Sequence, residues 1–106
     1  MDTDEHIDRY LTWAVLVRNL SANTVAAYSR DLIEAGRFID NLVFADSARI
    51  GQWLQHLLKE GLAPSTISRD LSSLRAFYSY LVHRELLESN PAAKIRPPLK
   101  AFKVPY

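Results

Sequence analysis

Apolar residues recur along this chain every three or four positions, the spacing that places side chains on one face of an α-helix. The clearest stretch lies between Asp46 and Gly61. Its apolar positions form a single stripe, made of Ile50, Trp53, Leu54, Leu57 and Leu58. Asp is a favoured N-cap and Gly a common terminator. The pattern therefore predicts a helix that begins after Asp46 and ends at Gly61.

Two helices are predicted before this one. The first covers residues 4–19, with Thr3 as its N-cap and carboxylates in its first turn, where they complement the helix dipole. The second begins where Ser21 or Asn23 can cap it, and its apolar stripe continues to Ile39. Only a few residues separate the two helices, so we expect them to pack as neighbours.

A fourth helix is predicted to start at Pro64, because proline suits the first helical position. It runs to about His83 or Leu87. Asn90 marks a boundary, since a residue that precedes proline resists helical geometry. After Pro91 the sequence predicts one further turn at most, followed by an extended, basic, proline-rich tail.

These elements predict an all-α fold, a compact four-helix bundle. We assign residues 1–90 to the helical domain and residues 91–106 to a linker. A length of 106 residues suits a single domain. The hydrophobic content of 48% and the charged content of 24% are typical of soluble globular proteins.

Charge is distributed unevenly along the chain. Residues 1–62 hold six Lys/Arg and nine Asp/Glu, a net charge of −3, whereas residues 63–106 hold seven and three, a net charge of +4. This asymmetry is compatible with an anionic partner. The absence of cysteine fits a reducing compartment, and no apolar run reaches the ~18 residues of a membrane span. We therefore expect a cytoplasmic protein without a membrane partner.

The outward face of the fourth helix is unusual for a solvated surface. It consists of small residues and guanidinium groups: Ser65, Ser68, Arg69, Ser72, Arg75, Ala76 and Ser79. A solvated helix face favours Glu and Lys, and residues 65–79 contain neither. Short side chains allow close approach to another surface, while Ser and Arg can bind phosphate or base edges in a major groove. The face is suited to DNA binding; the alternatives are a helix that merely tolerates serine and a helix that packs its small face on another protein helix.

The second helix repeats this chemistry. Its outward side presents Asn23, Ala26, Ala27 and Arg30. Free N–H groups at its N-terminus, near Thr24, form a natural phosphate site, although N-capping alone explains the polar residues there. Two such helices in one small domain strengthen the case for DNA.

Three runs of the sequence resemble tyrosine recombinases of the phage-integrase class. SANTVAAYSRDL at 21–32 is similar to the start of that family's second helix, and STISRDLSSLRAFYSYL at 65–81 to its fourth. NPAAKIRPP at 90–98 is similar to the junction that leads to the catalytic domain. Their order and spacing resemble the N-terminal core-binding, or SAM-like, domain, at a level shared by Xer-type resolvases and by integron and phage integrases.

The resemblance implies a DNA-binding role. In the family this domain forms half of a C-shaped clamp around a duplex recombination half-site, and its first helix contacts other recombinase protomers. The implied DNA contacts are Thr24, Tyr28, Arg30, Ser65, Ser68, Arg69, Ser72 and Arg75. The linker cations Lys94, Arg96, Lys100 and Lys103 would meet phosphate, or are only solvated. The helical position of Tyr28 favours the core, with its hydroxyl at the rim.

The resemblance implies no catalysis by this chain itself. The family cleaves DNA with a tyrosine assisted by arginine, lysine and histidine or tryptophan residues of a C-terminal domain, and Tyr106 has no such partners around it. We therefore expect a fragment of a longer recombinase. The histidines are isolated, so no metal or other cofactor is predicted. A helical protein-interaction module is the main alternative; a free-standing enzyme lacks a clustered nucleophile and base.

Overall fold

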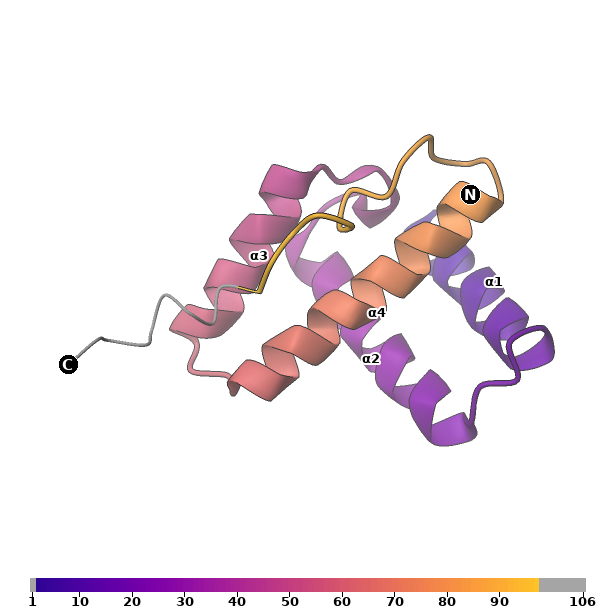
Figure 1. Cartoon of the computed structure of the whole chain (residues 1–106), viewed down its shortest axis with the longest axis horizontal. Coiled ribbons are helices and arrows are strands. Elements are labelled where there is room, and N and C mark those ends of the chain that lie inside the picture. Colours follow the sequence, from indigo (N-terminus) through magenta and orange to yellow (C-terminus); the bar gives the residue numbers. More distant parts are fainter. Residues whose placement is uncertain (1, 98–106) are drawn as a thin grey trace.

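The computed structural model describes residues 2–97, and these form a helical bundle around one long central helix (Figure 1). The elements are α1 (Thr3–Leu16), α2 (Ala22–Phe38), the short 3-10 helix η1 (Leu42–Phe44), α3 (Ser47–Lys59) and α4 (Pro64–His83). Helix α4 packs against α1, α2 and α3, and α1 also packs against α2 and η1. The prediction of an all-α bundle is confirmed, and the described residues contain no strand.

Most predicted helix boundaries are confirmed by local hydrogen bonds. The Asp46 carboxylate caps α3 by accepting a hydrogen bond from the Arg49 N–H at 2.8 Å. Ser21 caps α2, and Pro64 opens α4. Gly61 follows α3 with φ of 84°, a left-handed conformation that glycine adopts without a steric cost. These ends are set by residues close in sequence, which explains why they could be predicted.

Both ends of α1 differ from the prediction. Asp2, not Thr3, is the N-cap, and its carboxylate accepts a hydrogen bond from the Glu5 N–H at 2.9 Å. The helix ends at Leu16 rather than at residue 19. Asn19 has φ of 54°, and such a left-handed residue commonly follows a helix and closes its C-terminus.

The hydrophobic core is centred on α4. Its inward residues are buried: Ile67, Leu71, Leu74, Phe77, Tyr78 and Leu81. The Tyr78 hydroxyl donates a hydrogen bond to the Leu42 carbonyl at 2.6 Å, and burial raises the pKa of Tyr78. This bond secures η1, an element that the apolar spacing did not predict. Each fully buried large side chain contributes about 1.5–3 kcal/mol, so α4 holds the other helices together.

The chain that follows α4 turns back across the bundle (Figure 1). Ala92 is completely buried, and the Pro91 carbonyl accepts a hydrogen bond from the Ser47 hydroxyl at 2.7 Å. The Asn90 amide donates to the Arg75 carbonyl and to the Ser79 hydroxyl, each at 3.0 Å. The first residues of the predicted linker are thus packed on α3 and α4. The predicted extended tail covers residues 96–106, and its residues from 98 onward lie outside the described residues.

Candidate nucleic-acid interface

The outward face of α4 is open to solvent, which confirms the orientation predicted for it. Its exposed members are Ser65, Arg69, Ser72 and Ser79, and its half-buried members are Ser68, Arg75 and Ala76. The Arg69 side chain keeps 43% of its surface accessible. On the neighbouring helix α2, Arg30 is exposed and Thr24 is half-buried. Small and cationic side chains therefore reach the surface from two helices in contact.

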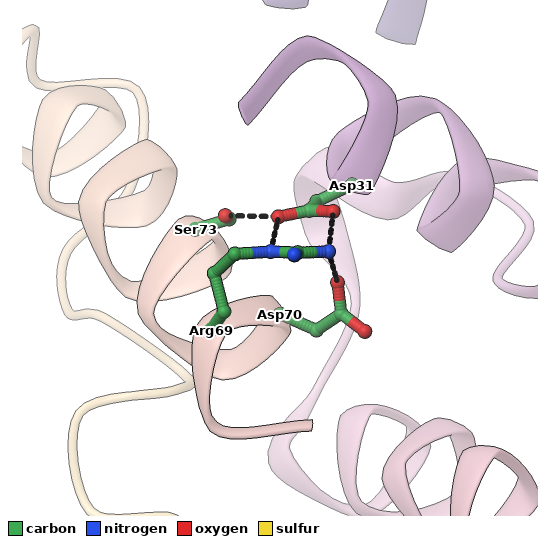
Figure 2. Close-up of polar contacts among 4 residues, drawn as sticks. All are labelled: Asp31, Arg69, Asp70 and Ser73. Atoms are coloured by element: carbon green, nitrogen blue, oxygen red, sulfur yellow. Dashed lines mark hydrogen bonds and ion pairs between the residues drawn. The ribbon is translucent and has the colours of Figure 1, made fainter. Parts of the chain in front are cut away.

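Arg69 also pairs with a buried carboxylate of α2 (Figure 2). Its Nε donates to Oδ2 of Asp31 at 3.1 Å, and its Nη2 donates to Oδ1 at 3.0 Å. The Ser73 hydroxyl donates to the same Oδ2 at 2.7 Å. Asp31 is only 1% exposed, so this pair links α2 to α4 beneath the surface. The hydrogen bond to Asp31 raises the pKa of Arg69, which keeps the guanidinium charged.

A second buried carboxylate lies beside this pair. Oδ1 of Asp70 is 3.8 Å from Nη2 of Arg69 and has no hydrogen-bond partner among residues 2–97. Burial, together with the nearby Asp31 carboxylate, raises the pKa of Asp70 to about 7. Glu34 adds to this increase. Two buried carboxylates therefore share one guanidinium, so the cluster carries an excess negative charge when Asp70 is ionised.

Arg75 has different partners, although it lies on the same helix. Its Nε donates to the Ala92 carbonyl at 3.1 Å, and its Nη2 donates to the Ile95 carbonyl. Both acceptors belong to the segment that follows α4. The half-buried guanidinium of Arg75 therefore holds that segment against the helix, and its role as a DNA contact stays a prediction.

The remaining predicted contacts are dispersed around this surface. Thr24 accepts a hydrogen bond from the Ser21 hydroxyl at 2.9 Å, within the cap of α2. Tyr28 is half-buried and packs against the core, with part of its surface in a cleft next to Tyr10. Lys94 and Arg96 are exposed near the end of the described chain. Lys100 and Lys103 lie outside the described residues.

Sequence reasoning missed the buried carboxylates, although the chain contains a signal for them. The tetrapeptide SRDL occurs twice, at 29–32 and at 68–71. In each copy the Asp directly precedes a fully buried leucine, Leu32 or Leu71. An acid at the edge of an apolar stripe on each of two helices predicts buried charge that needs a cation. Only the packing of α2 on α4 shows that one arginine serves both.

Residues 2–97 contain no group of three His, Asp or Glu side chains that could hold a metal ion. Within that range, no helix has the length and apolar character needed to cross a lipid bilayer.

Comparison with known proteins identifies the domain. A model of the phage integrase N-terminal SAM-like domain matches residues 7–85. The chain belongs to this family. Three similar relatives are the tyrosine recombinase XerC of Alcanivorax borkumensis (36% identical over 99% of this chain), XerD of Listeria innocua (30% over 93%) and XerC of Neisseria meningitidis serogroup C (35% over 94%). No solved structure shows significant similarity.

The phage-integrase SAM-like domain accounts for a limited part of these relatives. The chain spans 36% of the length of the Alcanivorax protein and 35% of the other two. About two thirds of each relative therefore has no counterpart in this chain. The resemblance predicted from the three sequence runs is confirmed at the level of an N-terminal domain of a tyrosine recombinase.

Proposed function

We propose that this domain binds duplex DNA at a recombination half-site and serves as the N-terminal clamp domain of a site-specific tyrosine recombinase. The observation that carries the proposal is that small hydroxyl side chains and Arg69 on α4, and Arg30 on α2, are exposed on two helices that pack against each other. Short side chains let two helices approach a major groove, and the cations attract phosphate. The relatives are named tyrosine recombinases, and a DNA-binding role fits that name.

The proposed contacts fall into two groups. Arg30, Lys94 and Arg96 are exposed cations and form no ion pair within residues 2–97, so they are suited to phosphate. Along the two helices, the proposed groove contacts are Thr24, Tyr28, Ser65, Ser68, Arg69, Ser72 and Arg75. The division between a domain at 1–90 and a linker at 91–106, which leads to a catalytic domain, belongs to the same proposal.

A surface of α1 supports a second role, contact with other recombinase protomers. Val15, Leu16 and Val17 form an apolar patch at the C-terminal end of α1, with exposed fractions of 45%, 77% and 64%. Exposed apolar patches are typical of protein interfaces. A helical interaction module is therefore compatible with DNA binding, because the patch lies on a different helix from the cationic face.

Salt-dependent binding tests the DNA proposal. The 106-residue chain is titrated into a fluorescent 30-bp duplex between about 30 and 200 mM salt, with anisotropy as the readout. Each phosphate contact contributes about 0.9 to the slope of log affinity against log salt. Arg30→Ala is expected to reduce that slope by about one contact. Arg9→Ala, an exposed arginine of α1, is the matched control and is expected to leave the slope unchanged.

The proposal is rejected if the wild-type chain binds no duplex at the lowest salt concentration. It is also rejected if Arg9→Ala weakens binding as much as Arg30→Ala does, because the affinity would then reflect total charge and not a defined surface.

A further inference from the structure

The guanidinium of Arg69 is held along one edge and free along another. Arginine has five N–H groups in a rigid planar fork. Asp31 accepts one hydrogen bond from Nε and one from Nη2, and these two bonds occupy the side edge of the guanidinium. Nη1 has no hydrogen-bond partner among residues 2–97. Nη2 also lies 3.8 Å from Oδ1 of Asp70, which is too long for a hydrogen bond. The edge formed by Nη1 and Nη2 therefore keeps N–H groups that have no hydrogen-bond partner among residues 2–97 and could serve a ligand.

Asp31 is itself held firmly. It is buried on α2, and the Ser73 hydroxyl of α4 donates to its Oδ2 at 2.7 Å (Figure 2). The backbone of Arg69 is fixed in α4 and its guanidinium is fixed from α2, so the side chain has little rotational freedom. The entropy cost of ordering this long side chain is thus incurred on folding and not on binding a ligand.

The charge of the pair affects which ligand it suits. Asp31 offsets the positive charge of Arg69, and Asp70 adds a further negative charge when it is ionised. The cluster therefore attracts a phosphate less strongly than a lone arginine does. A planar fork with two adjacent donors still matches the O6 and N7 acceptors that guanine presents in the major groove. Fixed orientation and reduced net charge both favour a base edge over the DNA backbone.

We propose that Asp31 is a positioning residue that orients Arg69 to read a guanine in the major groove, and so sets the base preference of this domain. The proposal rests on the DNA-binding function proposed above. Asp31 touches no DNA in this arrangement, because its carboxylate is buried behind the guanidinium.

The Asp31→Asn variant distinguishes an ion pair that only stabilises the fold from one that positions Arg69. If the pair only stabilises the fold, its loss weakens all DNA binding in proportion to the unfolded fraction. If Asp31 positions Arg69, the folded variant loses its preference for guanine. At the same time its affinity for unrelated duplexes increases, because a negative charge beneath the binding surface has been removed. The preference for guanine therefore falls while the affinity for unrelated duplexes rises.

The experiment begins with selection of binding sites from a randomised duplex library by the 106-residue chain. The preferred guanine is then replaced by 7-deazaguanine, which lacks the N7 acceptor. We expect the wild-type chain to lose about tenfold in affinity, in line with one bidentate base contact. Asp31→Asn and Arg69→Lys are each expected to lose less than twofold on the same replacement, and the double variant no more than either alone.

Glu34→Gln is the matched control, because it removes the same charge from an exposed position three residues further along α2. It is expected to bind unrelated duplexes more tightly and to keep the full response to 7-deazaguanine. Circular dichroism checks that each variant is folded. If Asp31→Asn does not fold, Ser73→Ala is used in its place, because this variant removes only the hydroxyl that fixes Asp31. Ser73→Ala is expected to reduce the loss of affinity caused by 7-deazaguanine to about threefold.

Two outcomes overturn the inference while leaving DNA binding intact. One is a folded Asp31→Asn, or its Ser73→Ala replacement, that keeps the full tenfold response; the other is a wild-type chain that binds duplexes without preference for guanine. Failure of the wild-type chain to bind any duplex at 30 mM salt is a distinct result, and it rejects the proposed function together with the inference.

Discussion

Arg69 and Arg75 lie six residues apart on α4, yet their guanidinium groups have partners of different kinds. Arg69 binds the buried carboxylate of Asp31, which belongs to another helix. Arg75 binds backbone carbonyls of Ala92 and Ile95, in the segment that follows its own helix. Arg69 therefore joins two helices through an ion pair, whereas Arg75 holds the segment after α4 against the helix through neutral carbonyl acceptors.

The difference teaches how much each contact matters to the fold. A buried carboxylate that loses its cation keeps its charge in a poorly solvated site, which is costly. The carbonyls of Ala92 and Ile95 are neutral, so leaving them without this donor costs less than leaving a buried charge unpaired. We therefore expect substitution of Arg69 to lower the free energy of unfolding strongly and by an amount that depends on pH. Substitution of Arg75 is expected to lower it weakly and without pH dependence.

The largest effect is expected for Arg69→Ala. At pH 8 it leaves Asp31 and Asp70 buried without a cation, and we expect the free energy of unfolding to fall by about 2–3 kcal/mol. At pH 5 the loss is smaller, because Asp70 then binds a proton. Urea unfolding at both pH values measures this difference. Arg30→Ala, at an exposed arginine, is the control and is expected to change stability by less than about 0.5 kcal/mol.

A smaller effect of opposite sign is expected for Asp70→Asn. Because the pKa of Asp70 is raised from 3.8 to about 7, the native state binds more protons than the unfolded state between those values. Stability contributed by this group therefore falls as pH rises from about 4 to 7. The amide removes the titration, so we expect a gain of about 1–2 kcal/mol at pH 8 and roughly a third of that at pH 5. An equal gain at both pH values would contradict the explanation.

The smallest effect on stability is expected for Arg75→Ala. Loss of the bonds to the Ala92 and Ile95 carbonyls costs about 1 kcal/mol, with the same value at pH 5 and pH 8. The segment after α4 is expected to loosen, so trypsin should cleave at Lys94 several times faster than in the wild-type chain. Arg69→Ala, cleaved under the same conditions at 10 °C and pH 8, serves as the comparison for a general loss of stability. Unchanged cleavage in Arg75→Ala would show that Ala92 burial alone holds the segment.

Much of the fold could be predicted because its signals are local. Caps such as Ser21 and Asp46, the proline that opens α4 and the glycine after α3 act on neighbouring backbone groups. The outward face of α4 could be predicted from helical periodicity in the same way. The end of α1 could not, because the chain continues with apolar residues past Leu16 and the left-handed Asn19 closes the helix.

The candidate site was only partly predictable for the same reason. Helical spacing placed Arg69 and Ser72 on the outside, and the structure agrees. It could not show that Asp31, 38 residues earlier, would meet Arg69, or that the segment at 90–95 would fold back onto Arg75. Those contacts depend on how whole helices pack.

The sequence alone determined four helices, their faces and a surface of hydroxyl groups and arginines, since each depends on residues within one or two helical turns. The tertiary structure decided what each arginine does. Charge burial and hydrogen bonding depend on which groups the packed helices bring within about 3 Å, and the contact between α2 and α4 gave Arg69 a carboxylate while the returning chain gave Arg75 two carbonyls.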